Sequence, residues 1–243
     1  MAKKYTKPEE TFQEFISDYQ NIFKEEIISI ILYGSGARKD FTPGKSDINF
    51  LIVLTENGIK QLNKAEENVK KWWKHKVSIP LFLTESYIKS SLDTFPIEFF
   101  NMKLHYKVVW GKDIFKEIEI KPEDLRRQCE REIKGKLLHL RQSYFHFNLD
   151  KKQIYTLIPT SLRTFMAFFP SILQLKGEQI PETRKEMLDR IVTAFNLDKD
   201  VFNSLWNITS GKSKVDRKNI KELFLKYIEE IRKLANAVDQ WEK

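Results

Sequence analysis

The chain has 243 residues, of which 41% are hydrophobic, and this is enough to bury one large core or two modest ones. No stretch approaches the roughly 20 apolar residues that span a bilayer, and the first residues lack the apolar segment of a signal peptide, so we expect a cytoplasmic protein with no membrane segment. The single cysteine, Cys129, excludes an internal disulfide, and its place in an apolar helical stripe is typical of a small core residue.

The net charge of +8 is concentrated in the second half of the chain. Residues 1–120 contain 18 Lys and Arg against 17 Asp and Glu, whereas residues 121–243 contain 24 against 17. A basic surface attracts nucleic acid, an anionic nucleotide or an acidic partner protein, but scattered lysines also occur on ordinary solvated surfaces. Nucleic-acid binding is therefore a minor hypothesis, and the sequence is also compatible with a homodimer.

Helices and strands alternate in the first half of the chain. Residues 8–24 place apolar side chains at three- and four-residue spacing, which predicts an amphipathic helix. Short β-branched apolar runs predict two buried strands, over 27–33 and 48–54, on either side of a glycine-rich connection. The later elements that we predict are helix over 57–76, a strand over 77–83 with Pro80 at an edge or bulge, a short helix over 85–94 and a strand over 96–102.

The second half of the chain is predicted to be entirely helical. Proline and glycine residues divide it into helices at 123–149, 152–176, 183–196, 198–209 and 217–241. We therefore predict an α+β protein in which a mixed-sheet domain, residues 1–120, is followed by a helical bundle domain, residues 121–243.

The glycine-rich connection after the first strand is suited to binding phosphate. Glycines allow main-chain N–H groups to approach phosphate oxygens, and Gly34, Ser35 and Gly36 supply such a turn. Arg38 and Lys45 are further candidates for phosphate contacts, although each could also be an ordinary surface charge.

The start of the second strand offers oxygen ligands. Residues two apart in a strand point to one face, so Asp47 and Asn49 present their oxygens side by side while Ile48, Phe50 and Ile52 enter the core. Paired oxygens of this kind can hold Mg²⁺ against substrate phosphates. The alternative is an ordinary connection in which Asp47 bonds the amides of a turn.

The whole pattern, LYGSGARKDFTPGKSDINFLIVL over residues 32–54, resembles the DNA polymerase beta-like nucleotidyltransferase superfamily, which includes kanamycin nucleotidyltransferase and minimal bacterial nucleotidyltransferases. The resemblance implies transfer of a nucleoside monophosphate from a nucleoside triphosphate, ATP foremost, to an acceptor that the sequence does not identify. It also implies Mg²⁺ or Mn²⁺ at the site. The residues that carry it are Gly34-Ser35, Ala37-Arg38 and Asp47-Ile48-Asn49.

The pattern departs from this superfamily at Asn49, where a second metal-binding acid is expected. An amide carbonyl can ligate Mg²⁺ but brings no negative charge, so a two-metal site loses attraction for its cations. Three hypotheses stay open: transfer with a single metal, nucleotide binding without turnover, or a scaffold whose helical half binds a partner.

The superfamily also uses a third carboxylate, from a later strand, as the base for the incoming hydroxyl. The predicted strand over 77–83 contains no acid, so the resemblance points to Glu98 in the predicted strand over 96–102. Neighbouring apolar side chains would desolvate Glu98 there and make it basic, unless it lies on the solvent face of an edge strand. Asp93, in a predicted helix, is the weaker candidate.

Overall fold

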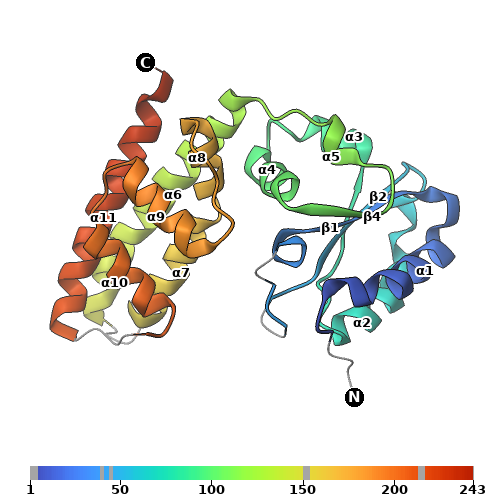
Figure 1. Ribbon diagram of the computed structural model, residues 1–243, viewed down its shortest axis with the longest axis horizontal. Coiled ribbons are helices and arrows are strands. Elements are labelled where there is room, and N and C mark those ends of the chain that lie inside the picture. The colour runs from blue at the N-terminus through green and yellow to red at the C-terminus, as the bar shows by residue number, and fades with distance from the viewer. Residues whose placement is uncertain (1–4, 39–40, 44–45, 150–153, 213–216, 243) are drawn as a thin grey trace. The chain divides into compact units, whose positions relative to one another are not determined.

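The computed structural model describes two compact units, which divide between Lys121 and Pro122 (Figure 1). The residues that it describes are 5–38, 41–43, 46–149, 154–212 and 217–242.

The first unit is built on a four-stranded mixed sheet with the strand order β3-β2-β1-β4. Strand β1 (Ile27–Tyr33) pairs antiparallel with β2 (Asn49–Leu54) and with β4 (Tyr106–Gly111), and β2 pairs parallel with β3 (Leu81–Thr84). The two central strands are apolar along almost their whole length because both faces of the sheet are covered. This arrangement confirms the mixed sheet that the alternating elements predicted.

Helices cover both faces of this sheet (Figure 1). Helices α1 (Phe12–Phe23) and α2 (Glu66–Lys74) pack on one face, and α3 (Glu85–Ser90), α4 (Pro96–Leu104) and α5 (Ile114–Glu117) pack on the other. Short 3-10 turns complete the unit, at η1 (Pro8–Thr11), η2 (Lys24–Glu26), η3 (Gly34–Ala37) and η4 (Ile59–Ala65).

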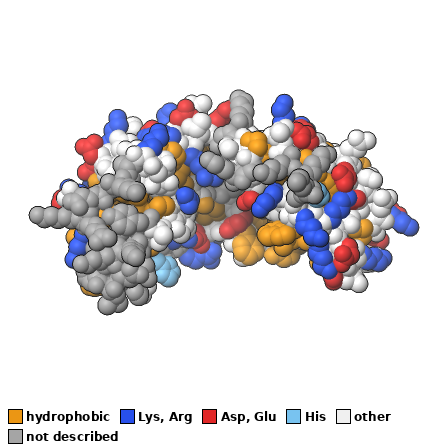
Figure 2. Space-filling view, turned by 90° about the horizontal axis from the view of Figure 1, so that it is seen from below, with side chains coloured by type: hydrophobic (Ala, Val, Ile, Leu, Met, Phe, Trp, Pro, Cys, Tyr) orange, Lys and Arg blue, Asp and Glu red, His pale blue; other side chains and the backbone are white. Residues whose placement is uncertain are grey.

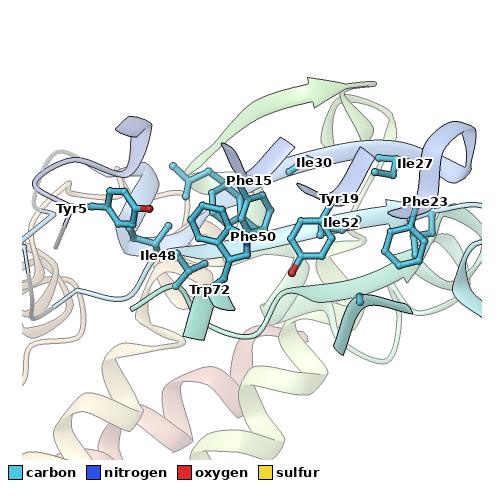
Figure 3. Packing of buried hydrophobic residues seen from close by; sticks show 14 residues of the cluster. Tyr5, Phe15, Tyr19, Phe23, Ile27, Ile30, Ile48, Phe50, Ile52 and Trp72 are labelled. Carbon is cyan, nitrogen blue, oxygen red and sulfur yellow. The ribbon is translucent and has the colours of Figure 1, made fainter. Parts of the chain in front are cut away.

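Aromatic side chains fill the core between α1, α2 and the sheet (Figure 3). The rings of Phe15 and Phe50 stack with their centroids 3.9 Å apart, and Phe15 meets the edge of the Trp72 indole at 5.1 Å. The Trp72 indole N–H donates to Oδ2 of Asp18 at 2.9 Å, so the buried indole keeps its polar atom bonded. This core holds β2 rigidly from Ile48 onward.

Two elements differ from the predictions. Residues 96–102 were expected to form a strand, but Pro96–Leu104 is helix α4, and the strand that pairs with β1 is Tyr106–Gly111 instead. Proline at the first turn of a helix loses no hydrogen bond and has a suitable φ, so Pro96 favours the helix start that the prediction overlooked. The predicted strand over 77–83 is confined to Leu81–Thr84, preceded by an isolated bridge between Ile48 and Val77.

The second unit is all helical, as predicted. Its longest helices are α6 (Pro122–Leu149) and α11 (Arg217–Asp239), which run antiparallel, because Lys134 contacts Asp239 at one end and Lys221 lies over the Tyr144 ring near the other. The remaining helices are α7 (Ile154–Met166), α8 (Phe169–Lys176), α9 (Arg184–Ala194), α10 (Lys199–Thr209) and η5 (Gln240–Glu242). The single helix predicted over 152–176 is therefore two helices.

Among the described residues, no helix is long and apolar enough to cross a membrane.

Candidate nucleotide site

The glycine-rich segment forms a single 3-10 turn directly after β1. Gly34 adopts φ +71°, a left-handed conformation that favours glycine, and its N–H donates to the main-chain oxygen of His105 at 3.1 Å. The first N–H groups of such a turn have no partner within the turn itself. In a 3-10 helix the third amide, here that of Gly36, bonds the carbonyl of the N-cap residue Tyr33, and the Gly34 amide is already bonded, so the amide of Ser35 is the one in this turn that the geometry leaves for an anion.

The second half of the motif lies at the start of β2. Asp47 is exposed and Asn49 is half-buried, while Ile48 between them is buried in the core. Ile48, Phe50 and Ile52 belong to one core cluster, so Asn49 lies on the opposite face of the sheet, while Asp47 precedes β2 and its place on that face stays a prediction.

The two halves of the motif meet across the β1 and β2 pair. Tyr33 is the register partner of Asn49, so the turn begins beside that side chain. The hydroxyl of Ser35 donates to the main-chain oxygen of Asp47 at 3.3 Å, and a Cβ atom on Gly34 would lie 3.8 Å from Nδ2 of Asn49. The structure therefore brings together the turn, the main chain at Asp47 and the side chain of Asn49, while the place of the Asp47 carboxylate at this site stays a prediction.

Arg38 and Lys45 are the two basic residues that were predicted to contact phosphate. Arg38 follows the turn, is half-buried, and its main-chain N–H donates to the oxygen of Ser35 at 3.3 Å. Lys45 lies outside the described residues.

Glu98 does not occupy the position that the resemblance implied. It lies in the first turn of helix α4 and is exposed, while its neighbours Ile97 and Phe99 are buried. The expectation of a desolvated base on a strand is therefore wrong, because the helix turns its apolar neighbours inward and Glu98 outward. Asp93, the weaker candidate, is also exposed and accepts a hydrogen bond from Thr94 at 3.1 Å.

Neither β3 nor β4, the two strands that follow the motif, contains an acidic residue. The residue that reaches the start of β2 from the neighbouring chain segment is Ser78, whose N–H donates to the oxygen of Ile48 at 2.9 Å. Sequence reasoning missed this residue because the prediction extended a regular strand through it. A hydroxyl at this position cannot replace a carboxylate as a base at neutral pH.

Comparison with known proteins identifies the family of the first unit. Residues 13–105 match the family of nucleotidyltransferase domains. Residues 13–105 of this unit are therefore a nucleotidyltransferase domain, and the match supports the resemblance to the DNA polymerase beta-like superfamily. None of the curated proteins matches the sequence at a significant level.

The fold of the chain is similar to that of a spectinomycin adenyltransferase from Enterococcus faecialis, whose crystal structure contains ATP and spectinomycin. The two chains share 14% sequence identity with a TM-score of 0.54, and the likeness covers 93% of this chain and 99% of that one. At this identity the likeness concerns the fold alone, but it is too extensive to be confined to the nucleotidyltransferase domain.

The nucleotidyltransferase domain offers few donors for the divalent cations that its superfamily uses. Asp47 supplies one carboxylate and Asn49 one neutral amide oxygen, and no three His, Cys, Asp or Glu side chains cluster for a metal within the described ranges. Mg²⁺ is commonly bound by one or two carboxylates together with substrate phosphates. These residues therefore fit a single cation shared with a triphosphate, and they do not fit two.

Two tyrosines flank the turn on the sheet. Tyr33 and Tyr106 are register partners on β1 and β4, and burial raises the pKa of both hydroxyls. The Tyr106 hydroxyl also donates to Oδ2 of Asp113 at 3.2 Å, which raises its pKa further. Both phenols are therefore neutral at physiological pH and add no charge beside the turn.

The basic surplus of the chain does not form a single stripe on the face drawn in Figure 2, where lysine and arginine side chains are interspersed with acidic ones. On helix α11, for example, Lys226 pairs with Glu222 and Arg232 with Glu229. Such paired charges are typical of a solvated helix surface. Nucleic-acid binding therefore stays a prediction without a structural feature to support it.

Proposed function

We propose that the nucleotidyltransferase domain binds a nucleoside triphosphate, with ATP as the first candidate, together with one divalent cation. We also propose that it lacks some of the catalytic groups that rapid nucleotidyl transfer requires. The observation that carries this proposal is the meeting of the η3 turn with Asp47 and Asn49 across two paired strands. The turn contacts the main chain of Asp47, and we infer that the Asp47 carboxylate completes one site there for a phosphate chain and its cation.

The proposed binding follows from the donors and acceptors of the chain. The amide of Ser35 would donate to a phosphate oxygen, and Asp47, with the amide oxygen of Asn49, would hold Mg²⁺ or Mn²⁺. The chemistry that such a cation supplies is neutralisation of phosphate charge and orientation of the nucleotide.

The missing groups explain why we expect transfer to be slow or absent. The superfamily's second acid is replaced by Asn49, and neither β3 nor β4 brings a third acid. Without a base, the acceptor hydroxyl would have to lose its proton to water, and general-base catalysis typically contributes about 100-fold to 10,000-fold.

Transfer of a nucleoside monophosphate to an acceptor is the second candidate function. It is favoured by the fold likeness, over 93% of the chain, to an adenyltransferase whose structure contains ATP and spectinomycin. In that case we infer that the helical unit, roughly residues 121–243, contacts the acceptor, whereas in a non-catalytic protein it would bind a partner.

Titration calorimetry tests the leading proposal. ATP with Mg²⁺ should release or absorb measurable heat, and Asp47→Ala should weaken binding because it removes the carboxylate proposed to hold the cation. Asp93→Ala is the matched control, since Asp93 is an exposed acid of the same unit that lies outside the motif. The absence of heat with all four nucleoside triphosphates would remove the proposal. Incubation with α-labelled ATP then separates the two functions, because label on an acceptor or on the protein itself requires transfer.

A further inference from the structure

The side chain of Asn49 is placed to contact a nucleotide directly. It lies beside the start of the η3 turn, with Nδ2 as its nearest atom to the Cβ position of Gly34, at 3.8 Å. It is half-buried on the face of β2 that is predicted to carry Asp47, and its amide bonds no other residue in the part of the chain that the structure describes.

The amide differs from a carboxylate in having two kinds of polar atom. Its oxygen can accept a hydrogen bond or ligate a cation, and its NH₂ group donates two hydrogen bonds. A carboxylate at the same position can only accept. The Asn49 amide lies beside the η3 turn and can present its donating end there, where the Ser35 amide also leaves an N–H group for an anion.

The charge of the ligand makes this difference decisive. A triphosphate at the turn is strongly anionic, so a second carboxylate beside it would repel it unless a second cation lay between them. An N–H donor instead attracts a phosphate oxygen directly, and hydrogen bonds to charged groups are the stronger class.

We propose that Asn49 donates a hydrogen bond from Nδ2 to a phosphate oxygen of the bound nucleotide, so that the domain holds a triphosphate without the second cation of its superfamily. This inference rests on the proposed nucleotide binding and assigns Asn49 a role beyond that of a weakened metal ligand. The hydrogen bond from Asn49 would supply part of the attraction for the triphosphate that a second cation supplies in other members of the superfamily.

The test is the dependence of ATP affinity on divalent cation, measured by calorimetry in Mg²⁺ and in EDTA. The wild type should lose some affinity for ATP in EDTA, because the Asp47 carboxylate then repels the free triphosphate, but about tenfold less than Asn49→Asp, which has two carboxylates there. Asn49→Asp should weaken binding in EDTA by about tenfold or more and recover in Mg²⁺, because the carboxylate adds repulsion that a cation reverses. Asn49→Ala should weaken binding in both buffers, because it removes the donor and adds no charge.

Asn49→Asp keeps almost the same shape, and circular dichroism of each variant checks that the fold is retained. If wild-type binding requires Mg²⁺ as strongly as that of Asn49→Asp, or if Asn49→Ala binds like the wild type in EDTA, the role of Asn49 is refuted while nucleotide binding stands. Binding of ATP in neither buffer refutes the proposed function and this inference together.

Discussion

The response of the protein to metal alone depends on the residue beside Asp47. Replacing Asn49 with Asp puts two carboxylates on one face of β2, two residues and therefore about 6.6 Å apart. Two unit charges at that distance repel by about 0.6 kcal/mol in water-like surroundings and by about 2.5 kcal/mol at the effective dielectric constant of a protein surface. Without metal, the variant should therefore be less stable than the wild type.

Mg²⁺ or Mn²⁺ should reverse this loss in Asn49→Asp, because a cation between two carboxylates turns their repulsion into attraction. Binding to the folded state alone stabilises it by about 2.7 kcal/mol at a metal concentration 100 times the dissociation constant. In a unit of this size, 1 kcal/mol corresponds to a shift of about 4 °C in Tm.

Thermal unfolding in EDTA and across a metal titration, without nucleotide, measures both effects. The variant should start below the wild type and gain more from metal. Asn236→Asp is the control for added charge, because Asn236 is exposed in the other unit, one turn after Arg232. Equal metal responses in wild type and Asn49→Asp would refute the reasoning, since they would mean that positions 47 and 49 do not share a cation.

Three further predictions concern Gly111, Cys129 and Glu98. Gly111→Ala should strongly destabilise the first unit in urea unfolding, because the new Cβ would lie 2.2 Å from the oxygen of Ile28. Gly177→Ala is the control: Gly177 has a similar positive φ but open space around it, so this change should lower the free energy of unfolding by only about 1 kcal/mol or slightly more. Burial raises the pKa of the Cys129 thiol to about 12, so iodoacetamide should not alkylate the native protein at pH 8 but should alkylate it in denaturant; the stability that this shift represents is present below the thiol's unfolded pKa and is lost as the pH rises toward 12. Glu98→Gln should leave ATP affinity within about twofold of the wild-type value in calorimetry, because Glu98 is exposed in helix α4. A larger loss of affinity would mean that Glu98 does contact the nucleotide.

The strands that position the site could be predicted from the sequence because their signals are local. Ile27–Tyr33 is an uninterrupted β-branched run, and β1 has the predicted bounds. The sequence also predicted that positions 47 and 49 would share a face, since strand geometry alone decides this.

The place of the third acid could not be predicted, because it depends on which segment becomes the outer strand. The segment 96–102 has strand-forming Ile and Phe residues, but Pro96 at a helix start and burial of Phe99 against the sheet favour helix. The segment that pairs with β1, Tyr106–Gly111, is only half-buried and carries a weaker apolar signal. Tertiary pairing therefore overrode local propensity at the one position on which the catalytic prediction depended.

The alternation along β2 has an evolutionary consequence. Ile48, Phe50 and Ile52 belong to the core, whereas Asn49 belongs to neither hydrophobic cluster. Mutations at position 49 therefore leave the packing of the core almost unchanged and act mainly on the charge and chemistry of the site. A lineage that stopped needing transfer could lose the acid there by drift, without an intermediate that misfolds, and a lineage that regained the need could restore it by a single substitution.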